Sequence, residues 1–495
     1  MASLGRAVRD ATPPRAAATF LSAFVLVAVV AFADGGYFRE TWGWTAIALS
    51  TLVCVVLLLR ERIVLAWRDL AAIGALGAFV FWVALSAAWS SDSDDSLQEA
   101  ERGLVYVAAL LAFLLLVGRE EVRELLAGVA AAVALVAVYS VSLRLFPSEP
   151  ISSDPIQGTR LIDPLGYANT LAILTTVGLL LSLGLAVHGR TRLERALWAA
   201  VPVLLASTLT LTESRGTAFA LVTGLGLFLL VESRRSAVSA VALAVAVPAL
   251  VAVWLTWRSS ALRDAAATLE NTSDAGRRLA LALAVLALAS ALASLGAAWI
   301  EARLPPLRKL SLALPGALVV ALVCAILIAV IRSDRPLGPR VDYWRVAWVQ
   351  WEENAWLGSG AGTFVHYWRR EDMPVDVRDA HSLYLETLAE LGPVGLALLL
   401  CALGLPLLST LQAGRHPLVP VAVAAYVAYL AHAGLDWDWE MPAVTLTGVL
   451  CAVALLAAAR HGQAQITIGP RGRAGFALAA LAIASVALTG RIVAA

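Results

Sequence analysis

Long apolar stretches alternate with short polar ones along almost the whole chain. A hydrocarbon core of roughly 30 Å needs about 20 apolar helical residues per crossing, and many of the stretches approach that length. The Ala, Leu and Val runs lack the every-second-residue alternation of a membrane β-barrel. The pattern therefore predicts an all-α protein, a polytopic bundle of transmembrane helices.

The number of predicted spans is about 12–15, depending on whether the shortest apolar stretches are counted. Their approximate limits are 16–33, 42–59, 70–89, 103–117, 125–146, 165–187, 196–211, 217–231, 237–257, 279–300, 310–331, 394–411, 418–434, 443–459 and 475–493. The longest polar stretch separates the last four from the others. We therefore divide the chain into N-terminal helices at 1–331 (about 11 spans), an extramembrane loop at 332–390, and C-terminal helices at 391–495 (about 3–4 spans).

Charge alternates between the polar loops. Every second loop is rich in Arg, and the others are acidic or neutral, among them 90–101, 147–158 and 434–440. Cytoplasmic loops are enriched in basic residues. The alternation predicts a cytoplasmic N-terminus, which we interpret as an uncleaved signal anchor, and an extracytoplasmic loop at 332–390. Because neither ATP nor nucleotide sugars are available outside, a substrate bound there has to arrive already activated.

Composition narrows the function further. Charged residues make up 15% of the chain and hydrophobic residues 60%, whereas soluble domains are nearer a quarter charged. The net charge of +1 gives no indication of a nucleic-acid partner. The four Cys lie inside apolar runs without metal-ligand spacing, so we expect buried small hydrophobes and no metal site.

The first half of the loop at 332–390 predicts an amphipathic helix over 340–356. Trp344, Trp348 and Trp351 recur at helical spacing and form an aromatic stripe. Trp at such spacing is typical of an interfacial helix anchored at headgroup depth. Arg340 and Arg345 on this helix have two interpretations, contact with lipid phosphate or recognition of a substrate phosphate.

A glycine-rich turn follows at 358–363, with the sequence GSGAGT. Backbone N–H groups of Gly360 and Gly362 are candidates for holding a phosphate. A tight turn without a ligand is the alternative. The turn follows no strand and faces outward, so a dinucleotide or ATP site is excluded.

His381 opens the next apolar pattern. If the helix begins here, His381 shares a face with Leu385 and Leu388, and Tyr384 lies beside it. A histidine in that position is either a structural, hydrogen-bonded group or a general base acting on a hydroxyl. We interpret His366, in the same loop, as interfacial.

Three further sites lie at predicted outer ends of spans. Arg215, in ESRGT, is a functional candidate because charge at a span boundary is costly, although pairing with Glu213 would also explain it. Asn169 could cap a helix or bind a ligand. The acidic and aromatic turn at 436–440, preceded by His432, suits a sugar, a base or a divalent cation, but also a solvated turn.

Several Arg and one His on one side of the membrane suit a lipid-linked sugar diphosphate. The planar guanidinium recognises phosphate well, and such a donor carries its activation in the phosphate ester. Displacing the diphosphate requires cations on the leaving group and a base on the acceptor hydroxyl.

The order of these motifs resembles that of a known family. Arg340 precedes Trp344 by four residues, LGSGAGTF follows at 357–364, and AHSLYLETLAELGPVG follows at 380–395. This resembles the core of the O-antigen ligase and O-antigen polymerase family. DPLGYANTLA at 163–172 and ESRGT at 213–217 resemble its other signatures, whereas the turn at 436–440 does not.

The resemblance implies a glycosyltransferase-C-like helix bundle that transfers a glycan from undecaprenyl diphosphate to an acceptor outside the bacterial plasma membrane. No metal or cofactor is implied. His381 would activate the acceptor hydroxyl, while Arg215 and Arg340 hold the diphosphate. Arg345, Tyr384, Asn169, Gly360 and Gly362 are the expected substrate-binding residues. The expected partners are the lipid-linked glycan, a glycan, lipid or protein acceptor, membrane lipids and other envelope-assembly proteins.

Alternatives remain within and outside this class. A polymerase or a protein glycosylase would use the same residues with another acceptor. A transporter or flippase for a lipid-linked oligosaccharide would place charge deep within broken helices, whereas the spans here are almost free of charge. A non-catalytic scaffold would depend on no single Arg or His.

Overall fold

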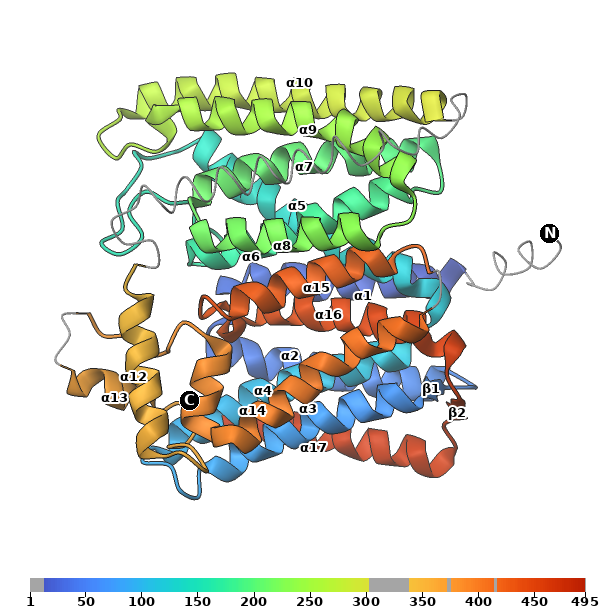
Figure 1. Ribbon diagram of the computed structural model, residues 1–495, viewed down its shortest axis with the longest axis vertical. Coiled ribbons are helices and arrows are strands. Elements are labelled where there is room, and N and C mark those ends of the chain that lie inside the picture. Colours follow the sequence, from blue (N-terminus) through green and yellow to red (C-terminus); the bar gives the residue numbers. More distant parts are fainter. Residues whose placement is uncertain (1–12, 302–337, 372–374, 414–415, 495) are drawn as a thin grey trace.

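A computed structural model describes residues 13–301, 338–371, 375–413 and 416–494. These ranges contain sixteen α-helices and one two-stranded sheet. Most of the helices lie side by side and nearly parallel, as Figure 1 shows. The predicted all-α, polytopic architecture is confirmed.

Most of the helices belong to the bundle, and the short helices α12 and α13 lie at one end of it. The α-helices are α1 (Pro13–Ala31), α2 (Arg39–Leu59), α3 (Trp67–Ser86), α4 (Ser93–Leu116), α5 (Val122–Leu145), α6 (Ala168–Val187), α7 (Arg192–Thr212), α8 (Arg215–Val231), α9 (Arg235–Arg258), α10 (Leu269–Glu301), α12 (Arg340–Glu353), α13 (Phe364–Arg370), α14 (Leu383–Ser409), α15 (Val419–Ala433), α16 (Pro442–Ala459) and α17 (Pro470–Ala494). Single 3₁₀ turns are η1 (Asp34–Gly36), η2 (Arg119–Glu121), η3 (Ser260–Leu262), η4 (Thr410–Gln412), η5 (Asp438–Glu440) and η6 (Arg460–Gly462).

Within the described ranges, eleven helices are long and apolar enough to cross a membrane, and α8 and α15 are shorter apolar helices. Each predicted span coincides with one helix, except the span at 310–331, which lies outside the described residues. The predicted loop at 90–101 is wrong over most of its length, because α4 already begins at Ser93. Asp92 caps that helix by accepting a hydrogen bond from the Asp95 N–H at 3.1 Å.

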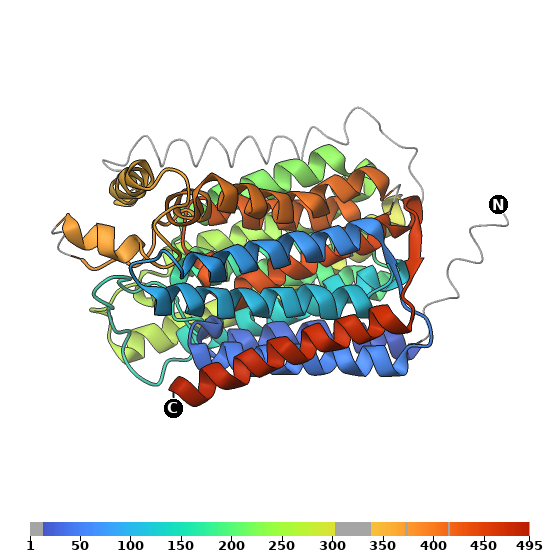
Figure 2. The same ribbon diagram turned by 90° about the horizontal axis from the view of Figure 1, so that it is seen from below.

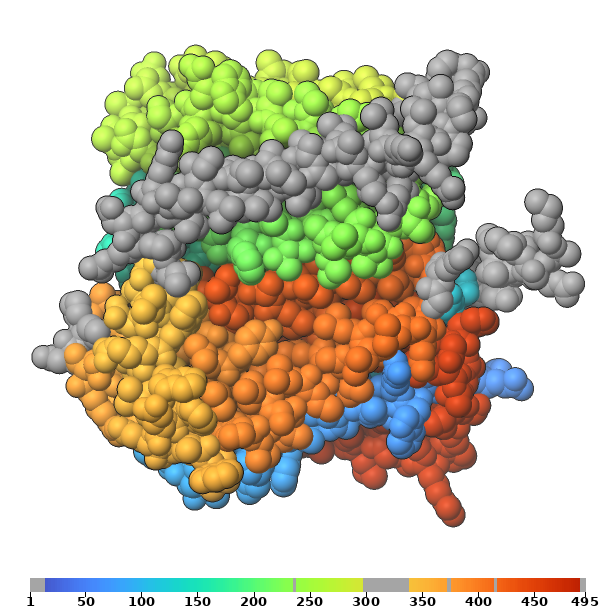
Figure 3. Space-filling view, in the orientation of Figure 1, coloured from blue at the N-terminus to red at the C-terminus, as the bar shows by residue number. Residues whose placement is uncertain are grey.

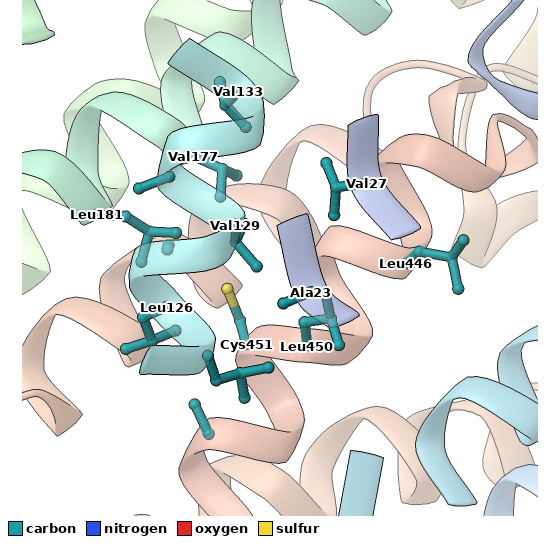
Figure 4. Close-up of a cluster of buried hydrophobic side chains, with 14 of the residues drawn as sticks. Ala23, Val27, Leu126, Val129, Val133, Val177, Leu181, Leu446, Leu450 and Cys451 are labelled. Carbon is teal, nitrogen blue, oxygen red and sulfur yellow. The ribbon is translucent and has the colours of Figure 1, made fainter. Parts of the chain in front are cut away.

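The core lies among α1, α5, α6 and α16. Figure 4 shows aliphatic side chains of these four helices around Cys451. Among the candidate spans, α16 and α6 are the most buried, whereas α17 is almost entirely peripheral. Burial of Cys451 agrees with the expectation of a small buried hydrophobe, but Cys401 is exposed on α14, where that expectation is wrong.

Helices α12 and α13 lie outside the parallel helices, at one end of the bundle (Figure 2). The predicted aromatic helix is confirmed as α12, which ends at Glu353 and packs on α13 and α14. Tyr343, Phe364 and Trp368 belong to a small apolar cluster of their own. In Figure 3 the surfaces of α12, α13 and α14 are continuous over this end of the molecule.

Helix α14 is interrupted where the predicted loop ends. Gly392 has φ 65° and ψ −174°, and a Cβ there would lie 2.3 Å from the carbonyl oxygen of Trp356. Only glycine adopts this backbone without strain. The segment Leu383–Leu391 can therefore lie close against the turn that follows α12.

The opposite end of the bundle carries the sheet. Strand β1 (Val64–Ala66) pairs antiparallel with β2 (Gln465–Thr467), with Leu65 opposite Ile466. This pairing joins the loop after α2 to the loop before α17. The candidate site and the sheet thus occupy opposite ends of the helices (Figure 1).

Candidate functional site

Asp436 lies at the centre of a buried polar cluster. Its Oδ2 accepts hydrogen bonds from Arg340 Nη2 and from Asn169 Nδ2, both at 2.6 Å. Its Oδ1 accepts from the Tyr167 hydroxyl and from the Trp437 N–H, both at 3.0 Å. The side chain is fully buried, so this carboxylate is a fixed charge held by four donors.

The turn between α15 and α16 positions Asp436. The N–H groups of Leu435 and Asp436 both donate to the carbonyl oxygen of His432, in the last turn of α15. Arg340, the first residue of α12, donates through Nε to the Leu435 carbonyl oxygen at 2.5 Å. The guanidinium therefore contacts the turn twice, and this pair of bonds places the start of α12 against it. Asn169 reaches the same carboxylate from the first turn of α6.

A second arginine, Arg160, joins the cluster from the loop before α6. Its Nε donates to the Thr212 carbonyl oxygen at 2.7 Å, and Nη2 donates to Asn169 Oδ1. Burial is the main cause that lowers the pKa of Arg160 below its usual range. Sequence analysis did not select this residue. The available signal was a lone Arg following a loop that otherwise carries acidic and neutral residues.

His381 lies beside the same cluster but not on a helix. Its φ is 52° and α14 begins two residues later, at Leu383. The predicted helical face shared with Leu385 and Leu388 is therefore wrong, because a left-handed residue cannot continue a helix. Its Nδ1 is 2.8 Å from Asp379 Oδ1. The imidazole ring packs against Tyr343, with ring centroids 4.6 Å apart.

Tyr343 connects His381 to Arg340. It lies three residues after Arg340 on α12, hence on the same side of that helix. Its ring also meets Trp368 edge to face at 5.0 Å. The imidazole is 15% exposed and the Arg340 side chain 22% exposed. Both groups therefore remain accessible to a ligand while their orientation is set by packing.

Charges in the cluster shift each other's ionisation. Burial opposes the charged form of His381, but the charges of Asp379 and Asp436 outweigh it and raise the pKa of the imidazole. Burial likewise opposes ionisation of Asp436, yet His432, His381 and Arg340 lower its pKa. The aspartate thus stays ionised, and the histidine holds its proton to higher pH than a free imidazole.

Arg215 begins α8 near the same turn, with an exposed side chain. Two positions later, Thr217 Oγ1 is 2.9 Å from His432 Nε2. The other nitrogen of that ring, Nδ1, is 2.8 Å from Asp438 Oδ1. Thr217, His432 and Asp438 are all fully buried. The two aspartates of one turn therefore hold Arg340 directly and the start of α8 through His432.

Four other predicted site residues make contacts elsewhere in the protein. Tyr384 donates its hydroxyl to the Leu430 carbonyl oxygen at 2.9 Å, joining α14 to α15. Arg345 pairs with Glu371 at 2.8 Å and is half exposed. The glycine turn directs its N–H groups at Glu390. Gly362 donates to the side chain at 2.9 Å, and Gly360 donates to its carbonyl oxygen at 2.8 Å. A carboxylate of the chain itself occupies the place where we expected a phosphate.

Two cavities lie end to end beneath this site. One, of about 100 Å³, is lined by Glu99, Arg102, Glu386 and Glu390, and the other, of about 120 Å³, is apolar. They share Leu76, Phe79, Tyr106, Leu383 and Trp439 in their walls. At the polar end, burial raises the pKa of Glu440 to about 7, although Arg102 lies 3.2 Å away.

Metal ligands are not grouped in the part of the chain that the structure describes. No set of three or more His, Cys, Asp or Glu side chains there is arranged to hold an ion. The chemistry available from the described groups is cationic and basic. Guanidinium groups suit an anionic leaving group, and an imidazole oriented by a carboxylate suits removal of a hydroxyl proton.

Comparison with known proteins finds one match, over part of the chain. Residues 274–400 match the family model described as O-antigen ligase. The match includes Arg340, His381 and the glycine turn, whereas Asn169, Arg160 and Asp436 lie outside it. A search of curated proteins returned no match. The resemblance expected from the sequence motifs is confirmed.

Proposed function

We propose that this chain, whose residues 274–400 match the family model described as O-antigen ligase, transfers a glycan from a polyprenyl-diphosphate donor to an acceptor hydroxyl outside the plasma membrane. The family and the helical architecture support a role in glycosyl transfer at a membrane. The observation that carries the finer proposal is one cluster containing Arg340, Asn169 and Asp436, with His381 beside it.

In this proposal the arginines neutralise the diphosphate. Arg340 is held through Nε and Nη2, which leaves part of its guanidinium fork directed at the partly open side. Arg160, anchored to Thr212 and Asn169, and Arg215, at the start of α8, supply further positive charge at this end. Such fixed donors stabilise charge that develops on a leaving group without having to reorganise.

His381 acts on the acceptor. Its Nε2 receives the hydroxyl proton while the acceptor oxygen bonds to the anomeric carbon, and the bond from that carbon to the phosphate oxygen breaks. The diphosphate leaves with the bonding electrons, and displacement from the opposite face inverts the anomeric centre. Asp379, 2.8 Å from Nδ1, keeps the tautomer that exposes Nε2 as the acceptor.

The cavities and the loop charges support the remaining assignments. The apolar cavity between α3, α14 and α15 suits the first isoprene units of the donor, because it offers aromatic and aliphatic walls. Arg-rich loops lie at the end that carries the sheet, so we assign that end to the cytoplasm. The candidate site is then extracytoplasmic, in the plasma membrane of a bacterium.

The test is transfer by purified protein. Polyprenyl-diphosphate-linked glycan is incubated with candidate acceptors, with and without EDTA, and released polyprenyl diphosphate is measured. We expect release that survives EDTA and falls at least about a hundredfold in His381→Ala and Arg340→Ala. His366→Ala and Arg369→Ala, substitutions in the neighbouring α13, serve as matched controls.

Two results would contradict the proposal. Release at the wild-type rate in His381→Ala would exclude His381 as the general base. Donor binding without release under any condition, unaffected by either site substitution, would favour a transporter of the lipid-linked glycan. The acceptor that gains sugar distinguishes a ligase from a polymerase or a protein glycosylase.

A further inference from the structure

A second cavity with charged walls lies at the opposite end of the bundle, beside the β1–β2 sheet. Its volume is about 260 Å³. Four separate segments converge on it, from the start of α1, the α2–β1 connection, the α4–η2 connection and η6 with β2. Five Arg and one His line it, and its walls contain no Asp or Glu; the lining residues are Arg15, Arg60, Arg62, Val64, Gly118, Arg119, Arg460, His461 and Gln465.

Three of these arginines have structural roles that fix their positions. Arg60 donates to the Leu115 carbonyl oxygen at 2.8 Å, at the end of α4. Arg460 donates to the carbonyl oxygens of Val117 and Leu114 at 2.6 and 2.8 Å, and to Asp69 at 2.7 Å. Arg119 donates to the Ala413 carbonyl oxygen at 3.3 Å. These bonds cap helix ends, but they also bring like charges together.

The remaining two arginines have no such role. Arg15 and Arg62 are exposed, and neither forms an ion pair or hydrogen bond with any residue that the structure describes. Two acids close to the cavity are already engaged. Asp69 binds Arg460, and Glu121 accepts a hydrogen bond from the Gly118 N–H at 2.9 Å. Glu61 and Glu120 belong to the same segments but do not line the cavity, so no acidic side chain on the wall itself balances its positive charge.

Mutual repulsion is visible at Arg60. Burial is the main cause that lowers the pKa of the Arg60 guanidinium, and the charge of Arg15 is the next. The charge of Arg460 also lowers this pKa, whereas the charge of Glu121 raises it. An anion in the cavity would relieve this repulsion, since Arg pairs with phosphate through charge-assisted bonds.

We propose that this cavity binds a phosphate group, and that the phosphate belongs to the headgroup of an anionic phospholipid. The adjoining surface favours a lipid over a soluble phosphate compound. Leu58 and Leu59, directly before Arg60, are 83% and 78% exposed, and Trp67 is 67% exposed. Exposed aliphatic residues next to an exposed Trp are typical of a membrane–water boundary, and basic pockets between transmembrane helices bind anionic headgroups.

The test uses the full chain purified in detergent, with phosphatidylglycerol, phosphatidylcholine and inorganic pyrophosphate as three separate probes. Native mass spectrometry counts bound lipid, and calorimetry measures pyrophosphate binding. The variant R15Q/R62Q removes the two arginines that cap no helix. The control R190Q/R192Q removes two arginines at the same end of the bundle, outside the cavity. A third variant, R15K/R62K, keeps the charge and reports on binding if the glutamine variant does not fold.

We expect phosphatidylglycerol to bind wild type and the control equally, and R15Q/R62Q roughly tenfold or more weakly. The lysine variant retains most of the binding, and phosphatidylcholine is not retained by any variant. Pyrophosphate binding that is lost in R15Q/R62Q, without phosphatidylglycerol binding, would keep the phosphate site but overturn the lipid source. Equal binding of phosphatidylglycerol to R15Q/R62Q and to the control, with no pyrophosphate binding, would overturn the site.

Discussion

Arg340 and Asp436 form a buried ion pair, with Nη2 and Oδ2 2.6 Å apart, although 96 residues separate them in the chain. The aspartate side chain is 1% exposed and the arginine 22% exposed. The carboxylate is thus committed to the interior, while one part of the guanidinium faces outward. The pair fixes the position of the Arg340 guanidinium and leaves this group partly accessible.

Removing the carboxylate should damage both stability and transfer. Asp436→Ala leaves Arg340, Asn169 and the Tyr167 hydroxyl without their shared acceptor. Breaking a buried charged pair costs about 3–5 kcal/mol. We expect a lower thermal unfolding temperature in detergent and loss of most glycan transfer. Asp376→Ala, which removes an exposed ion pair with Arg369, should change neither. Equal stability of Asp436→Ala and wild type would contradict the buried network.

The rate of transfer should depend on the ionisation of His381. A general base acts in its neutral form, so the rate rises as pH increases through the raised pKa of this imidazole. Asp379→Asn removes a negative charge that raises this pKa. The acidic limb of the pH–rate profile should therefore move to lower pH in Asp379→Asn, with a reduced maximum because the ring is less well oriented. A limb at the same pH in both proteins would exclude His381 as the titrating base.

The ring of Tyr343 should matter more than its hydroxyl. The ring packs on His381 and on Trp368, and an aromatic pair contributes about 0.5–1.5 kcal/mol beyond its buried area. Tyr343→Ala should reduce transfer at least about tenfold, whereas Tyr343→Phe should stay within about threefold of wild type. Comparing kcat for the two variants shows whether the ring or the hydroxyl of Tyr343 supports transfer. Equal loss in both would assign the effect to the hydroxyl.

The glycine turn should tolerate no side chain at its centre. Gly360 has φ 104°, and a Cβ there would lie 2.4 Å from Ser90. Gly360→Ala combines a strained backbone with overpacking, each costing about 1–3 kcal/mol. Thermal unfolding should show clear destabilisation. Gly74→Ala, on α3, where nothing lies within 4 Å of the new methyl group, should leave the unfolding temperature unchanged or raise it.

Sequence reasoning predicted the helices well because hydrophobic periodicity is a local property. The bundle and the aromatic helix α12 both follow from stretches of about 20 residues or fewer. It failed where a distant group decides the local structure. The N–H groups of the glycine turn are bound by Glu390, 28 residues away from Gly362. No local sequence pattern shows whether these N–H groups bind a carboxylate of the protein or a phosphate of a ligand.

The partners of Arg340 could not be predicted for the same reason, because they come from distant parts of the chain. Asn169 and Arg340 were both selected from the sequence, but their meeting on Asp436 depends on how α6, α12 and α15 pack. Arg160 was missed because the arginine bonds to Thr212 and Asn169, which lie 52 and 9 residues away. His381 was assigned to a helix because the apolar spacing continues through it. Its left-handed backbone reflects the contact with Tyr343 and Asp379, which the spacing does not encode.

The β1–β2 sheet has a consequence for the order in which the protein is assembled. The sheet pairs Val64–Ala66, near the start of the chain, with Gln465–Thr467, near its end. Arg473 donates to the Leu57 carbonyl oxygen, 416 residues away in the sequence. Helix α2 packs on α17, a neighbour that leaves the ribosome long after α2 itself. Helices α6, α7, α9 and α10 pack mainly on one another and meet their partners much earlier. The contacts among these four helices therefore form early in translation, whereas the contact of α2 with α17 forms late.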